Sequence, residues 1–260
     1  MVSFAERDHY FNRTIDKLQA SNLVEGIIQL GSGVAGYKDV LSDIDLMISI
    51  SSGEDSAKTK EVVLETLGDF NPVLIKEKNF YENVLLVIAI LENKLEFNIS
   101  IVPRELLIVK SPLWKVIVDK SGLVTEKMNV ENERFLQNPL KYEVHFDVPF
   151  EFAYCAFGLE KELKRNNLIY ALTLLQRMRE YTLIVQAMNE EKKLHQFKAY
   201  ETLDPAFIQA YLLTYPEFIS VENLLKSGRK LKHLFEETIS KSRTFSMNPN
   251  LNAVLNITLV

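Results

Sequence analysis

The chain has 260 residues, with 30 Lys and Arg against 35 Asp and Glu, and a formal net charge of −5 at pH 7. Apolar residues make up 47% and charged residues 25%, which is ordinary for a globular chain that can bury one large core or two smaller ones. The negative charge argues against a general nucleic-acid coat, which needs a positive surface, and a single cysteine, Cys155, excludes an intramolecular disulfide.

Membrane and secretory signals are missing from the sequence. The longest uninterrupted apolar run, Val84 to Leu91, has eight residues, far fewer than the about 20 that a membrane-spanning helix needs. The first residues lack the basic and apolar regions of a secretory signal, and the four histidines are too scattered for a zinc site. We therefore expect an intracellular, cytoplasmic protein without membrane association or structural zinc.

An amphipathic helix is the first predicted element. Ser3 and Glu6 form a capping-box pattern, and apolar residues recur at helical spacing from Phe4 to Leu18. One further helical stretch, at about 57–67, interrupts a series of β-rich runs at 26–30, 44–50, 73–75, 84–91 and 95–102. Five strands with few helices predict a sheet domain, which we assign to residues 1–145.

The pattern changes to long helices after Pro149. Helical spacing extends over 150–165, 168–189 and 223–240, and the best linker candidate lies at about 139–148. We assign residues 146–260 to a helical domain. The expected fold class is therefore α+β, with a mixed five-stranded sheet domain and flanking helices followed by a C-terminal helical bundle.

A glycine-rich loop and two aspartates carry the most chemical information. The loop Gly31-Ser32-Gly33 follows the first strand and offers backbone N–H groups and a hydroxyl to an anion. Asp43 and Asp45 are two residues apart at the head of the next strand, so their carboxylates emerge from one face. Two such charges repel unless a cation lies between them, and oxygen ligands favour Mg²⁺ or Mn²⁺. The pattern indicates a site for a divalent cation and a triphosphate.

This stretch resembles a known signature. Gly31-Ser32, Gly36 and Ser42-Asp43-Ile44-Asp45-Leu46 resemble the motif of the polymerase-β-like nucleotidyltransferase superfamily. Residues 114–122 resemble the segment that follows the sheet in aminoglycoside 6-adenylyltransferases, and the helix around 161–165 resembles one that places a Lys and an Arg near the nucleotide. Residues 172–188 are similar to the helical domain of lincosamide nucleotidyltransferases.

The resemblance implies a role for each matching residue. Asp43 and Asp45 would bind Mg²⁺ or Mn²⁺. The phosphates of ATP, or of another nucleoside triphosphate, would be held by backbone amides and polar side chains of Gly31, Ser32, Gly33, Lys161 and Arg165. The implied activity is transfer of a nucleoside monophosphate, AMP from ATP, to a hydroxyl of a small molecule such as an antibiotic. A monomer or a homodimer would carry it out.

The third acidic residue of the family has two candidates. Glu96 and Asn98 lie on the same face of the strand at 95–102. Glu96 would be a third catalytic carboxylate and metal ligand, which leaves the enzyme intact. Counted back from Pro103, the family position falls on Asn98, which cannot accept a proton and would impair catalysis. The sequence leaves both assignments open.

Other functions remain open for the same reason. Asn98 motivates a catalytically silent nucleotide-binding or regulatory module, and transfer of AMP to a protein is a further alternative. The charge balance argues against RNA-directed nucleotide addition. Asn166-Asn167 stands where the resembling aminoglycoside enzymes have acidic residues, which argues against a polycationic acceptor.

Overall fold

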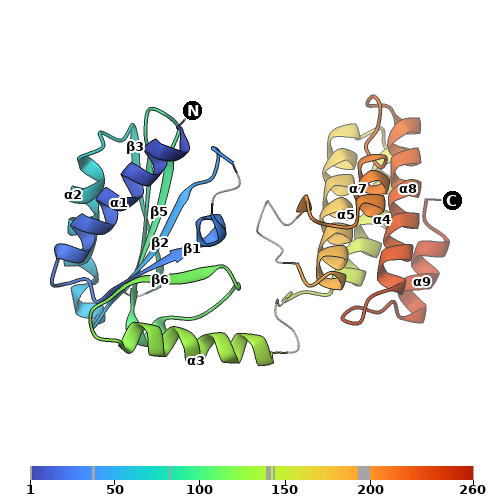
Figure 1. The fold of residues 1–260 in the computed structure, drawn as a ribbon. Coiled ribbons are helices and arrows are strands. Elements are labelled where there is room, and N and C mark those ends of the chain that lie inside the picture. The colour runs from blue at the N-terminus through green and yellow to red at the C-terminus, as the bar shows by residue number, and fades with distance from the viewer. Residues whose placement is uncertain are drawn as a thin grey trace. The chain divides into compact units, whose positions relative to one another are not determined.

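The computed structural model describes residues 2–36, 39–81, 83–138, 142, 144–192 and 200–259 (Figure 1). It divides into two compact units, Met1–Pro139 and Leu140–Val260. Each unit contains its own cluster of buried apolar side chains. The boundary expected from the sequence, at 145/146, lies a few residues beyond this division.

A mixed six-stranded sheet forms the centre of the first unit. Its order is β3-β4-β5-β2-β1-β6, in which β2 and β5 are parallel and the other neighbouring pairs are antiparallel. The strands are β1 (Gly26–Leu30), β2 (Ile44–Ile50), β3 (Leu74–Tyr81), β4 (Val84–Ile90), β5 (Glu96–Pro103) and β6 (Trp114–Asp119). The α+β class and the mixed sheet are confirmed. The expected count of five strands is wrong, because β6 pairs with β1 and adds an edge strand.

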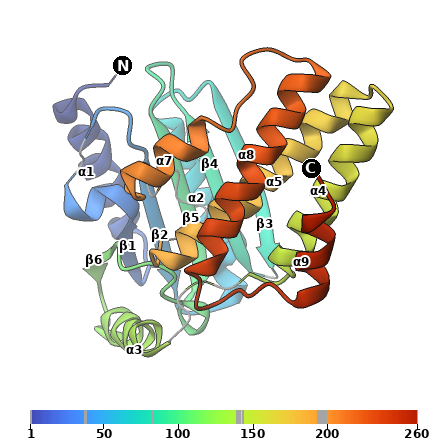
Figure 2. The same cartoon turned by 90° about the vertical axis from the view of Figure 1, so that its right-hand side faces the viewer.

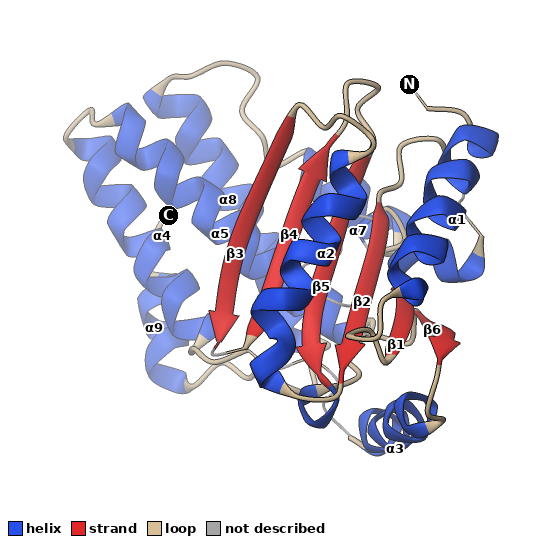
Figure 3. Cartoon of the chain, turned by 90° about the vertical axis from the view of Figure 1, so that its left-hand side faces the viewer, coloured by secondary structure: helices blue, strands red, loops and turns tan. Residues whose placement is uncertain are grey.

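Two helices cover one face of this sheet (Figure 3). They are α1 (Phe4–Ala20) and α2 (Ser56–Gly68), and their apolar sides bury residues such as Leu18 and Val63 against the sheet. The predicted capping box is present, because the Ser3 side chain accepts from the Glu6 N–H while the Glu6 carboxylate accepts from the Ser3 N–H. Helix α3 (Leu123–Gln137) packs against Ile28 and Met47, on the opposite face.

The second unit is a bundle of helices (Figure 2). They are α4 (Val148–Lys164), α5 (Leu168–Asn189), α7 (Pro205–Leu212), α8 (Val221–Ser240) and α9 (Pro249–Asn256). The helices expected at 150–165, 168–189 and 223–240 are confirmed as α4, α5 and α8. Phe152 of α4 stacks on Phe235 of α8 with ring centroids 3.7 Å apart, at the centre of the unit. None of the helices in the described residues is both long and apolar enough to cross a membrane.

Candidate functional site

The glycine-rich loop begins where β1 ends and lies directly against Asp45. Residues Gly31–Ala35 form one short 3₁₀ helix, η1, and the Gly31 N–H donates to the Leu113 carbonyl at 3.1 Å. Gly31 has φ +68°, and a Cβ atom there would lie 2.8 Å from Oδ2 of Asp45. Only glycine allows this backbone conformation and this close approach without strain. The start of the loop and Asp45 of the next strand therefore meet at one end of the sheet.

The turn before β2 fixes where the aspartates emerge. Oδ1 of Asp39 accepts the Leu41 N–H at 2.8 Å and the Ser42 hydroxyl at 3.1 Å. Such an Asx turn stiffens a short loop by replacing missing backbone hydrogen bonds. Ser42 is buried and immediately precedes Asp43. The position of Asp43 at the head of the strand is therefore set by local hydrogen bonds as well as by the sheet.

Arg7 ties this turn to helix α1. Its side chain is completely buried, and its Nη1 donates to the backbone carbonyl of Asp39 at 2.9 Å. A buried guanidinium is expensive to desolvate, so its hydrogen bonds hold the turn firmly. The sequence analysis did not single out Arg7, although a signal exists: it shares the buried face of an amphipathic helix with Thr14 and Leu18.

Asn98, and not Glu96, occupies the position beside Asp45. In the parallel register of β2 and β5, Asp45 is the partner of Asn98, whose Nδ2 donates to Oδ1 of Asp45 at 3.1 Å. Glu96 lies two residues earlier on the same face and is paired with Ile90 of β4. Within the described residues, no group of three or more His, Cys, Asp or Glu side chains is placed to hold a metal ion. The expected set of Asp43, Asp45 and Glu96 is therefore not assembled as a three-carboxylate centre.

The remaining donor set fits a divalent cation with fewer protein ligands. Proteins bind Mg²⁺ with one or two carboxylates when substrate phosphates and waters complete its shell. Asp43, just before β2, and Asp45, on β2, supply two such carboxylates, and the amide oxygen of Asn98 is a third oxygen donor close to Asp45. The backbone of Gly31 lies against Asp45 at the same place, and its own N–H donates to the Leu113 carbonyl.

Lys161 and Arg165, expected to assist in phosphate binding, belong to the second unit. The Lys161 ammonium lies 4.0 Å from the ring centroid of Phe157. Arg165 Nη1 pairs with Oε1 of Glu162 at 2.6 Å, and the Arg165 side chain is two-thirds exposed. Asn167 donates to the other oxygen of Glu162 at 2.7 Å. Arg165 is thus engaged by its own helix, and a nucleotide-binding role for both cations stays a prediction.

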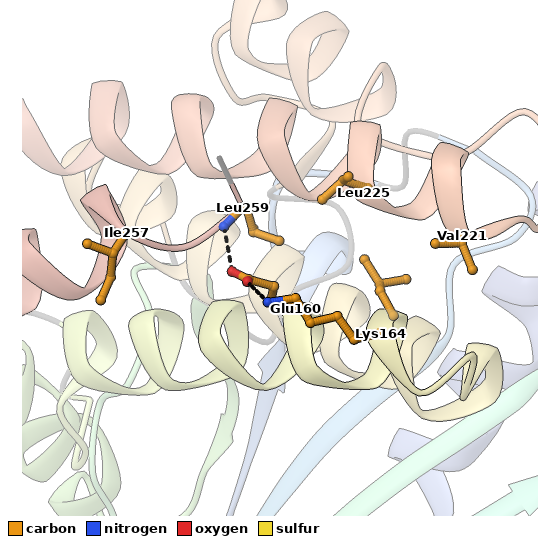
Figure 4. Close-up of a pocket in the computed structure, with 7 residues that line it drawn as sticks. Glu160, Lys164, Val221, Leu225, Ile257 and Leu259 are labelled. Atoms are coloured by element: carbon orange, nitrogen blue, oxygen red, sulfur yellow. Dashed lines mark hydrogen bonds and ion pairs between the residues drawn. The ribbon is translucent and has the colours of Figure 1, made fainter.

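Glu160 has a local structural partner of its own. Its carboxylate accepts the Leu259 N–H at 3.1 Å and pairs with Lys164 at 2.5 Å, and these interactions outweigh burial and lower the pKa of Glu160 (Figure 4). The pair borders a mostly apolar pocket of about 250 Å³ lined by Val221, Leu225 and Ile257 among others. None of the expected site residues lines this pocket. The role of Glu160 that the structure shows is a hydrogen bond between α4 and the backbone of Leu259.

Comparison with known proteins gives two similar solved structures. No protein-family model and no curated protein sequence matches this chain. The aminoglycoside 6-adenyltransferase of Bacillus subtilis is 13% identical, with a TM-score of 0.40 over 98% of this chain and 97% of that one. A nucleotidyltransferase-like protein from Exiguobacterium sibiricum is 13% identical, with a TM-score of 0.42 over 90% of this chain and 76% of that one.

Proposed function

We propose that the first unit binds a nucleoside triphosphate with a divalent cation and transfers its nucleoside monophosphate to a hydroxyl of a small molecule. The observation that supports this most directly is the approach of the Gly31 backbone to the Asp45 carboxylate, where a Cβ would lie 2.8 Å from Oδ2. A phosphate-binding loop and a cation-binding carboxylate then serve the same ligand. AMP from ATP, with Mg²⁺ or Mn²⁺, is the donor we expect.

The roles of the chain's own residues follow from their chemistry. The Ser32 hydroxyl and the N–H groups of Ser32 and Gly33 would bind the terminal phosphates and so hold the α-phosphorus in line with the attacking hydroxyl. Gly31, whose own N–H donates to the Leu113 carbonyl, would provide the close approach of the backbone. Asp43 and Asp45 would hold the cation, which would supply positive charge to neutralise the charge that develops on the phosphate oxygens. The acceptor oxygen forms a bond to the α-phosphorus, pyrophosphate leaves, and the hydroxyl proton passes to solvent or to a nearby base.

Calorimetry of the full chain tests nucleotide binding. Titration with ATP in the presence of Mg²⁺ should give saturable heat. Asp45→Asn should weaken the affinity for ATP at least tenfold, which corresponds to about 1.4 kcal/mol of binding free energy. A matched control is Asp69→Asn, because Asp69 lies on the α2 side of the unit and pairs with Arg13 at 3.2 Å. Absence of heat with ATP, GTP, CTP and UTP alike would refute the proposal.

A second candidate, nucleotide binding without transfer, is favoured by the Asn98–Asp45 hydrogen bond. An amide at this position donates to Asp45 and cannot take a proton from an acceptor hydroxyl. Pyrophosphate release with a panel of hydroxylated acceptors separates the two. Turnover that disappears in Asp45→Asn supports transfer, whereas persistent binding with no turnover supports the silent module. In that case Asn98→Asp is expected to create measurable pyrophosphate release.

A further inference from the structure

Two lysines without an acidic partner lie on the sheet face that carries Asp45. Glu77 pairs with Lys60 of α2 at 2.7 Å, which places the Glu77 side chain on the helix-covered face. Because side chains alternate along a strand, Lys76 and Lys78 lie on the opposite face. Both are exposed, and neither forms an ion pair or hydrogen bond within the part of the chain that the structure describes.

Strand register connects these lysines to the candidate site. Ile88 of β4 is the partner of Lys76 on one side and of Asn98 on the other. Asn98 is in turn the partner of Asp45. A single row of side chains therefore crosses four strands, in the order Lys76, Ile88, Asn98 and Asp45. With strands about 4.8 Å apart, the backbones at the two ends of this row are about 14 Å apart.

The sheet order places the Gly31 loop and the two lysines on opposite sides of Asp45. β1 and its loop at Gly31 flank β2 on one side, and β5, β4 and β3 follow on the other (Figure 3). If the triphosphate occupies the Gly31 loop, an acceptor attacking in line approaches from the other side of the α-phosphorus. That side lies over Asn98 and Ile88, with Lys76 beyond them.

We propose that this surface, formed by β5, β4 and β3, binds the acceptor, and that the acceptor is a hydroxylated small molecule with an anionic group, a carboxylate or a phosphate. The assignment of this ligand as the acceptor rests on the proposed function. The half-buried side chains of Leu86, Ile88 and Ile90 form an apolar floor for the carbon skeleton. Lys76 and Lys78 then supply charge-assisted hydrogen bonds to the anion.

Four compounds with a six-carbon sugar skeleton and different charges test the charge preference. Glucose 6-phosphate and gluconate carry the two anionic groups, glucose carries none, and glucosamine carries a positive charge. Each is titrated into the full chain, and binding is followed by the methyl resonance of Ile88, assigned with Ile88→Val. We expect saturable shifts with an anionic sugar and none with glucose or glucosamine. Comparison of the titrations with glucose 6-phosphate and gluconate shows which anion the lysines prefer.

Charge reversal tests the lysines themselves. The double variant Lys76→Glu, Lys78→Glu should weaken binding of the anionic sugar at least tenfold. The matched control is Lys115→Glu, because Lys115 is exposed on the opposite edge strand, β6, where its strand partner is Gln29 of β1. No saturable shift with either anionic sugar, equal affinity in the double variant, or preferential binding of glucosamine would overturn the proposal.

The same samples separate this inference from the proposed function. Under the proposal, the Lys76, Lys78 double variant keeps the wild-type affinity for ATP with Mg²⁺. A loss of ATP affinity in that variant would assign the lysines to the triphosphate and overturn the acceptor assignment. Wild-type protein that binds anionic sugar but no nucleotide would refute the proposed function while retaining an anion site at the lysines.

Discussion

The side-chain amide of Asn98 donates to Oδ1 of Asp45 at 3.1 Å, across the parallel pair formed by β2 and β5. This bond fixes the orientation of the Asp45 carboxylate without adding a negative charge beside it. A third carboxylate in this place would repel Asp45 in the absence of a cation and would bind a cation more strongly in its presence. The proposed cation site would therefore have less charge repulsion without a cation, and fewer proton acceptors with one.

Asn98→Asp should lower the stability of the protein without metal and increase the stability that it gains from metal. Replacement of the amide donor by a like charge should lower the free energy of unfolding by about 1–2 kcal/mol in a chelating buffer. Added Mn²⁺ should restore more stability to the variant than to wild-type protein. Urea unfolding with and without Mn²⁺ measures both values. Asn98→Ala is the control, since it loses the hydrogen bond without adding a carboxylate and should gain no more from Mn²⁺ than wild-type protein does; equal Mn²⁺ effects in all three proteins would contradict this prediction.

Gly31→Ala should damage the site as well as the fold. Alanine at φ +68° costs about 1 kcal/mol of backbone strain, and its Cβ would also lie 2.8 Å from the Asp45 carboxylate. We expect at least a tenfold loss of ATP affinity by calorimetry. Gly122→Ala is matched in backbone strain, with φ +79°, but its Cβ would meet nothing within 4 Å. An equal loss of affinity in both variants would show that the contact with Asp45 is irrelevant.

Local patterns predicted some strands well and others poorly. The bounds of β1 and β2 agree with the sequence, because glycine and serine residues flank compact apolar runs. The run predicted at 73–75 is wrong in length, since β3 extends to Tyr81. An edge strand with exposed residues on both faces leaves no alternation to detect. β6 lies at the other edge and is hard to detect for a related reason: all its residues except the exposed Lys115 are half-buried, and they do not alternate.

Only those features of the site that depend on local backbone geometry could be predicted from the sequence. That Asp43 and Asp45 share a face follows from the two-residue period of a strand. Which of Glu96 and Asn98 lies beside Asp45 depends on the register between two strands that are far apart in sequence. A shift of two residues would place Glu96 there instead, on the same face of the sheet. The contact of Arg7 with Asp39 is likewise tertiary, since 32 residues separate them.

Arg7→Met should destabilise the turn that precedes Asp43. The substitution removes a buried donor to the Asp39 carbonyl and should lower the free energy of unfolding by about 2 kcal/mol. ATP affinity should also fall, while Arg7→Lys should recover part of it by restoring a cation. The control is Arg13→Met on the same helix, because Arg13 is half-exposed and pairs only at the surface, with Asp69. Normal ATP affinity in folded Arg7→Met would argue against a positioning role.

Cys155 should be unreactive in the folded protein. The side chain is 2% exposed in α4, and burial raises the pKa of its thiol to about 11. At pH 8 the thiolate fraction is then about two orders of magnitude smaller than for an unfolded thiol with a pKa of about 8.5. A disulfide reagent such as dithionitrobenzoate should react slowly with native protein and rapidly in 6 M guanidinium chloride (about the concentration that unfolds most domains). Complete reaction of native protein within seconds would contradict this.

Asp119 should make the stability of the first unit depend on acidity. Burial raises the pKa of Asp119, but hydrogen bonds from the N–H and hydroxyl of Thr125 and from the N–H groups of Gly122 and Ser121 outweigh it, so the pKa is lowered overall. A carboxylate with a lowered pKa stabilises the fold above its unfolded pKa, and the contribution is lost as pH falls through the lower folded value. The ionised side chain holds the first turn of α3, where a cap contributes about 1 kcal/mol.

The Asp119→Asn variant should therefore be less stable than wild-type protein at pH 7, by about 1–2 kcal/mol. This difference should shrink steadily between pH 5 and pH 2, because protonation of wild-type Asp119 removes the charge that its four donors favour. Urea unfolding at each pH measures the difference, with Glu133→Gln, an exposed position of α3, as the control for a change in net charge. A difference that stays constant from pH 7 to pH 2 would mean that the cap acts through its shape alone and that the ionised state contributes nothing.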